Sequence, residues 1–186
     1  MLARGSAVSA PHNAWLSRDP QIALAFGIVL ALLIAAITVW STRLLVARTH
    51  WARTLHQELR ITLVGSSAGQ LALLAGLSAV AEELFFRAAL QPAVGLMAAS
   101  CAFGLVHVSP RGMGFAWTLW ALVMGLVFGL LFEASGNVLV PIVAHALINY
   151  ENMQYICNYD PTYFDIDRLR AHPRLHETRE RSTRDA

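Results

Sequence analysis

Long apolar runs separated by short polar segments dominate the chain between residues 21 and 156. The run 21–40 carries no charged residue, and its twenty positions match the length that crosses a bilayer as a helix. Four further runs show the same character and are predicted to be spans: 61–90, 93–108, 115–132 and 138–156. The pattern therefore predicts an all-α fold, a polytopic transmembrane helical bundle with about five spans.

The polar segments between these runs are predicted to be connections. Residues 43–60 contain four arginines against one acid and are predicted to form a basic loop, while 109–114 and 133–137 are predicted turns. As one straight helix, the run 61–90 would be about 45 Å long, which exceeds the thickness of a hydrocarbon core. We therefore expect that this helix is tilted, or that it is broken near its polar end.

The ends of the chain differ from its centre. Residues 1–20 form a polar N-terminal segment, and the predicted transmembrane core covers residues 21–158. Residues 159–186 are rich in charge, with six arginines and six acids from Asp160 onwards and few apolar residues. This composition predicts a mobile cytoplasmic tail.

The overall composition supports a membrane protein. Of the 186 residues, 56% are hydrophobic and 14% are charged, whereas a soluble domain has about 25% charged residues. The expected partner is therefore the lipid bilayer. The net charge of +2 is too small to indicate nucleic acid. The two cysteines, Cys101 and Cys157, form neither a CxxC pair nor a disulfide framework.

The arginines also predict an orientation. Cytoplasmic loops of membrane proteins are enriched in basic residues. If 43–60 lies in the cytoplasm, an odd number of spans places Arg111 and the arginine-rich tail there too, and Glu133 on the opposite side. The prediction is an N-terminus outside and a C-terminus inside.

Three charged residues interrupt an apolar stretch, SAVAEELFFRAAL, at residues 78–90. Charges inside a membrane are costly and mark functional sites. Glu83 and Arg87 are four residues apart, so they share a helix face and are predicted to form a structural ion pair. Glu82 is rotated from Glu83 by about 100° and is left without this partner. The alternative is that all three pair with one another at the water interface.

Further polar residues lie on other predicted spans. His107 ends one span, and His145 and Asn149 are spaced to share a helix face. Polar groups in membrane helices face the bundle interior, so these residues and Glu82 are expected to meet. Glu82 could accept a proton from water, and one histidine could share that task or hold a metal. The second histidine and the asparagine amide could donate hydrogen bonds to an oxyanion. Equally, Glu82, His107 and His145 could bind Zn²⁺ with water as the fourth ligand.

Three motifs carry a family resemblance: Glu82-Glu83-x-x-x-Arg87, Phe103-x-x-x-His107 and His145-x-x-x-Asn149. In their order and on separate apolar spans, they resemble the motifs of the CPBP (Abi) intramembrane protease family, which includes the CAAX prenyl endopeptidases and bacteriocin-processing proteins. The resemblance covers about residues 65–155. It implies a multi-pass peptidase of the bacterial cell membrane that cuts a membrane-associated protein or peptide near its terminus.

The resemblance also implies roles for individual residues. Glu82 would be the catalytic glutamate with His107 beside it, and His145 and Asn149 would stabilise the oxyanion or bind metal. The family has been described both as metalloproteases and as glutamate-dependent peptidases, so zinc stays an open cofactor. Two alternatives remain: a non-catalytic membrane protein that uses the His/Glu cluster to bind a ligand such as haem, and a scaffold whose polar groups only pack.

Overall fold

A computed structural model describes residues 15–108 and 114–161, and within these ranges the chain is helical and contains no strand. The predicted all-α fold is confirmed. Predictions for the first fourteen residues, the turn at 109–113 and the tail at 162–186 lie outside the described residues. The elements are α1 (Pro20–Arg48), α2 (His50–Leu63), α3 (Ala68–Glu83), the π-helix η1 (Leu84–Leu90), α4 (Gln91–Val94), α5 (Leu96–Val106), α6 (Gly114–Ser135) and α7 (Leu139–Asn158).

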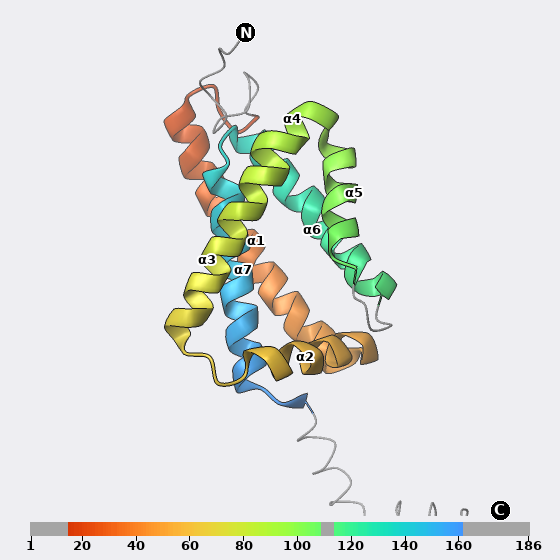
Figure 1. Ribbon diagram of the computed structural model, residues 1–186. Coiled ribbons are helices and arrows are strands. Elements are labelled where there is room, and N and C mark those ends of the chain that lie inside the picture. The colour runs from red at the N-terminus through yellow and green to blue at the C-terminus, as the bar shows by residue number, and fades with distance from the viewer. Residues whose placement is uncertain (1–14, 109–113, 162–186) are drawn as a thin grey trace, which may run out of the picture.

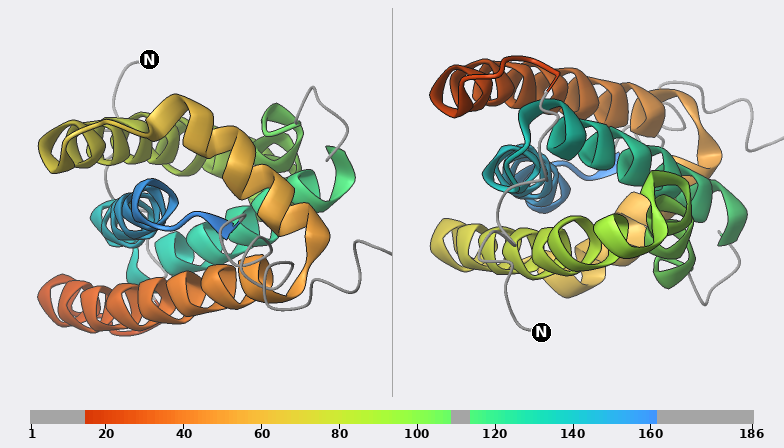
Figure 2. Two further views of the ribbon diagram at one scale, coloured as in Figure 1. Left: turned by 90° about the horizontal axis from the view of Figure 1, so that it is seen from below. Right: turned by 90° about the horizontal axis from the view of Figure 1, so that it is seen from above.

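Helix α7 occupies the centre of the bundle. It packs against α1 on one side and α3 on the other, and α6 packs against both α5 and α1 (Figure 1). Viewed along the bundle, α1 and α3 form opposite sides with α7 between them, and α2 crosses from one side to the other at one end (Figure 2). This arrangement directs residues of α3, α5 and α7 towards one interior space.

Small residues allow α1 to approach α7 closely. Asp19 begins α1 as its N-cap by accepting the backbone N–H of Gln21. Small residues then recur every four positions on the buried face: Ala23, Gly27, Ala31 and Ala35. A Cβ atom on Gly27 would lie 2.8 Å from Val140 Cγ2 of α7. Because membrane helices gain little from apolar burial, close packing of this kind holds them together.

The predicted basic loop at 43–60 is wrong. Helix α1 continues through Arg48, and α2 fills 50–63. Two of the arginines that indicated a loop, Arg53 and Arg60, instead bind helix ends. Arg53 Nε donates to the carbonyl of Val46 near the end of α1, and Arg60 donates to the carbonyls of Ile156 and Cys157 at the end of α7. A cation at these positions satisfies carbonyls that a helix end leaves free.

The long apolar run 61–90 is broken rather than continuous. Residues 64–67 separate α2 from α3, and the two helical segments meet at a bend of 114°. Gly65 has a φ of 92°, a conformation that glycine adopts without strain. Ser67 and Gln70 then form a capping box that begins α3. The break fits the expectation that this segment cannot be one straight span.

The number of spans stays a prediction. Within the described residues, the segments Pro20–Arg48 and Phe115–Ser135 are long and apolar enough to cross a membrane, and the bent pair would add a third if it counts as one span. The predicted span at 93–108 is divided between the end of α4 and the short helix Leu96–Val106. These apolar helices nevertheless identify an integral membrane protein.

Candidate active site

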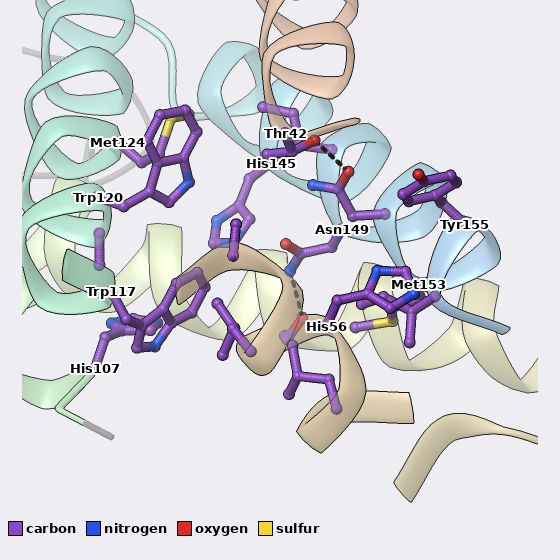
Figure 3. Close-up of a pocket in the computed structure, with 18 of the residues that line it drawn as sticks. Thr42, His56, His107, Trp117, Trp120, Met124, His145, Asn149, Met153 and Tyr155 are labelled. Carbon is purple, nitrogen blue, oxygen red and sulfur yellow. Dashed lines mark hydrogen bonds between the residues drawn. The ribbon is translucent and has the colours of Figure 1, made fainter. Parts of the chain in front are cut away.

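The bundle contains a pocket of about 460 Å³. Most of its wall is apolar. Helix α2 contributes Trp51, Leu55 and Leu59, and α6 contributes Trp117, Trp120 and Met124. The four residues predicted to be catalytic also line it: Glu82, His107, His145 and Asn149. The structure therefore brings together polar residues from three separate parts of the chain, as Figure 3 shows for His107, His145 and Asn149.

Glu82 and His107 face each other across one end of the pocket. Glu82 Oε2 lies 3.8 Å from His107 Nε2, and both side chains are partly exposed. His107 Nδ1 lies 2.7 Å from the carbonyl oxygen of Phe103, one turn earlier. A carbonyl only accepts, so Nδ1 carries a hydrogen, and in the neutral tautomer that this contact selects the lone pair is at Nε2. Glu82 Oε2 has no hydrogen-bond partner among the described residues.

Glu83 holds two partners in the protein interior. Its side chain is fully buried. One carboxylate oxygen lies 3.1 Å from Arg87 Nε, which is the ion pair that the spacing predicts. The other lies 2.7 Å from His145 Nδ1, a contact that the sequence did not predict. Glu83 therefore supports the position of a residue in the pocket as well as neutralising Arg87.

Arg87 is also fully buried, and its guanidinium contacts α6 and an aromatic ring. It lies in the π-helix η1, which follows α3 directly; such segments are frequent near functional sites. Its Nη2 donates to the carbonyl of Gly125 on α6 at 3.3 Å. Its guanidinium lies over the ring of Phe103, 4.7 Å from the centroid. These contacts stabilise a charge that is removed from water.

The remaining pocket groups are fixed by α3 and α6. The ring of His145 stacks on Phe128 of α6, with centroids 4.7 Å apart and an interplanar angle of 16°. Asn149 Nδ2 donates to Ser78 Oγ at 3.2 Å. Ser78 lies four residues before Glu82, so both occupy one face of α3. Ser78 was not predicted as a site residue, although its spacing from Glu82 is the signal that could have found it.

The zinc set predicted from Glu82, His107 and His145 is not supported. Within residues 15–108 and 114–161, no group of three His, Cys, Asp or Glu side chains is placed to hold a metal ion. The Nδ1 atom of His145 is engaged by Glu83 rather than facing Glu82. The donor set therefore does not fit a three-ligand zinc centre, and we derive no chemical step from one.

The fold and pocket define an integral membrane protein with a polar site enclosed by apolar helices. Residues 64–150, which carry all three motifs, match the family described as "Type II CAAX prenyl endopeptidase Rce1-like". The resemblance predicted from the sequence is thereby confirmed for this segment. The chain is also 39% identical over 75 residues to YpbD of Bacillus subtilis (strain 168), described as uncharacterized. That alignment covers 39% of this chain and 38% of the relative. No solved structure matches.

Proposed function

We propose that this protein is an intramembrane endopeptidase of the bacterial cell membrane, with its N-terminus outside and its C-terminus inside. It cleaves a membrane-associated protein or peptide near a terminus, using water activated by Glu82 and His107. The match of residues 64–150 to the Rce1-like family supports this class of reaction. The apolar wall of the pocket supports a substrate with a hydrophobic segment or lipid group beside the cleaved bond.

The spacing of Glu82 and His107 carries the proposal. Their facing atoms are 3.8 Å apart, which is too long for a direct hydrogen bond. The carboxylate and the neutral imidazole nitrogen both accept hydrogen bonds, so they need a shared donor. A water molecule about 2.8 Å from each atom fits between them and directs its lone pairs into the pocket.

His145 and Asn149 supply the complementary donors. Because Glu83 holds Nδ1, a protonated His145 ring has its second N–H free at Nε2. Asn149 uses one N–H for Ser78 and keeps the other. These two N–H groups stabilise the negative oxygen that forms when water adds to a carbonyl.

The reaction then follows in two steps. The water oxygen bonds to the scissile carbonyl carbon, its proton passes to Glu82, and the carbonyl oxygen becomes an oxyanion beside His145 and Asn149. As the oxyanion collapses, the C–N bond breaks and the proton moves from Glu82, directly or through His107, to the leaving nitrogen. The products are a carboxyl group and an amine, and the site returns to its starting state.

A library of peptides with varied sequences tests this proposal. The purified full chain in detergent is incubated with synthetic peptides, with and without an attached lipid, and products are identified by mass spectrometry. We expect cleavage by the wild type, and Glu82→Gln should abolish it because the amide cannot accept the proton. Glu82→Gln should still accumulate as folded protein, since Glu82 is partly exposed and does not join the buried Glu83–Arg87 pair.

Glu133→Gln is the matched control, because Glu133 lies on α6 and contacts Gln91 rather than the pocket groups. It should leave cleavage unchanged. Equal cleavage by the wild type and Glu82→Gln would contradict the proposal. Absence of cleavage combined with a haem absorption band in the purified protein would favour the alternative, a ligand-binding protein.

A further inference from the structure

A second asparagine of α7, Asn152, lines the pocket one turn beyond Asn149. Its Oδ1 lies 2.8 Å from the hydroxyl oxygen of Thr42 on α1. The same hydroxyl oxygen lies 2.8 Å from the carbonyl of Val39, three residues earlier. Figure 3 shows Thr42 beside the pocket on the side of α1. Asn152 is therefore held by a neighbouring helix at a position where its amide reaches the pocket.

This arrangement repeats the one around Asn149. Asn149 contacts Ser78 on α3, and the hydroxyl of Ser78 donates to the carbonyl of Ala75, also three residues earlier. Asn149 and Asn152 are thus each paired with a hydroxyl group from one of the two helices that flank α7. The pairing positions both amides, although only Asn149 belongs to the three family motifs.

Asn152 keeps hydrogen-bonding capacity after binding Thr42. The Thr42 hydroxyl has one hydrogen, and an asparagine amide has two N–H groups and one oxygen. If the amide oxygen faces Thr42, both N–H groups are free; if the amide nitrogen faces Thr42, one is. No hydrogen bond within the described part of the chain occupies Asn152 Nδ2, and this atom is not among the buried atoms without a partner.

The helical spacing of Asn149 and Asn152 suits the repeat of carbonyl groups along an extended peptide. Three residues on a helix correspond to about 4.5 Å along the axis and about 60° around it. Carbonyls on one side of an extended peptide repeat about every 6.7 Å. An extended chain that crosses α7 obliquely can therefore place one carbonyl at Asn149 and the next carbonyl on the same side at Asn152.

We propose that Asn152 is a substrate-binding residue that donates a hydrogen bond to a carbonyl-type oxygen of the peptide, two residues from the cleaved bond. The oxygen belongs to a backbone carbonyl or to the terminal carboxylate. Thr42 is a positioning residue that holds the Asn152 amide towards the pocket. This inference rests on the proposed peptidase function and adds a binding subsite to it.

The experiment measures KM and kcat separately. A peptide that the wild type cleaves in the library is resynthesised with a fluorophore and a quencher, in free-acid and amidated forms. Asn152→Leu should raise KM about three- to tenfold with kcat unchanged, as expected for one lost hydrogen bond that forms equally in the ground and transition states. Thr42→Val, which keeps the side-chain shape, should raise KM less, and Thr42→Ser should restore the wild-type value.

Two comparisons separate substrate binding from simple packing. The double variant Thr42→Val/Asn152→Leu should match Asn152→Leu, because Thr42 acts only through the amide. Thr54→Val is the matched control, since Thr54 lies on α2 outside the pocket lining and bonds the carbonyl of His50. An increase in KM confined to free-acid peptides would identify the terminal carboxylate as the oxygen; an equal increase for both forms would identify a backbone carbonyl.

The remaining outcomes would refute either the Asn152 subsite alone or the proposed peptidase function as well. If Glu82→Gln abolishes cleavage while both Asn152→Leu and Thr42→Val keep the wild-type KM, the subsite is wrong and the peptidase function stands. A decrease in kcat without a change in KM would likewise overturn the binding role. If the wild type cleaves no library peptide, or Glu82→Gln cleaves as well as the wild type, the proposed function fails and this inference fails with it.

Discussion

Replacing Glu83 with glutamine should damage folding and catalysis through two different contacts. The carboxylate lies 3.1 Å from Arg87 Nε and 2.7 Å from His145 Nδ1. The side chains of Glu83 and Arg87 are fully buried. Removing one partner of a buried ion pair costs about 3–5 kcal/mol. Arg87 keeps the Gly125 carbonyl and its contact with the Phe103 ring, so we expect the lower end of this range.

A double variant separates the two contacts. Glu83→Gln/Arg87→Met replaces the ion pair with neutral groups and should recover most of the stability, because exchanging a whole buried pair is often neutral. It should not recover turnover, because glutamine cannot stabilise a protonated His145. Loss of the carboxylate behind a catalytic histidine lowers kcat by about 10⁴-fold in the Ser-His-Asp triad, so we expect about 10²–10⁴-fold here.

Thermal unfolding in detergent and cleavage of the same quenched peptide provide the two measurements. A loss of about 3 kcal/mol should lower Tm by about 6–12 °C for a chain of this size. Glu133→Gln again serves as the control, since it changes a carboxylate that bonds Gln91 away from the pocket. Full recovery of turnover in the double variant would show that Glu83 does not position His145, and our reasoning about this contact would be wrong.

Two further predictions concern packing and orientation. Gly27→Ala places a methyl group 2.8 Å from Val140 Cγ2 and should destabilise the protein by about 1–3 kcal/mol in thermal unfolding, with Val140→Ala restoring part of the loss. Gly76→Ala is the control, because the added Cβ would meet no atom within 4 Å beyond its chain neighbours and its own helix backbone, and it should be neutral or stabilising; equal losses would contradict the packing argument. Reporter fusions at Ala186 and near Glu133 should give opposite signals. A reporter at Ala186 that signals the outer side would overturn the orientation.

The sequence predicts the helical class and the residues of the pocket because both depend on strong local signals. Apolar runs can only be helices or closed barrels in a membrane, and isolated polar residues must face inward. The pair Glu83–Arg87 follows from helical spacing alone. The convergence of Glu82, His107, His145 and Asn149 on one pocket follows from the same rule, while their individual roles stay proposals.

Other features depend on contacts between distant segments and could not be predicted. The arginines at 53 and 60 look like loop residues, yet each binds carbonyls at the end of another helix. The second partner of Glu83 lies 62 residues away on α7. The hydroxyl partners Ser78 and Thr42 carry no charge and have common neighbours, so they give no sequence signal until the packing around α7 is known.

The central place of α7 has a consequence for biogenesis. Glu83 and Arg87 are near each other as soon as their own helical segment forms, so this charge pair can enter the membrane already neutralised. The contacts of Glu83 with His145 and of Ser78 with Asn149 require α7 to arrive between α1 and α3, which are synthesised earlier. The nascent chain therefore inserts its proposed catalytic glutamate first and gains the proposed oxyanion donors only when α7 is inserted. The proposed site is therefore incomplete until α7, the last of these helices to be synthesised, has joined α1 and α3.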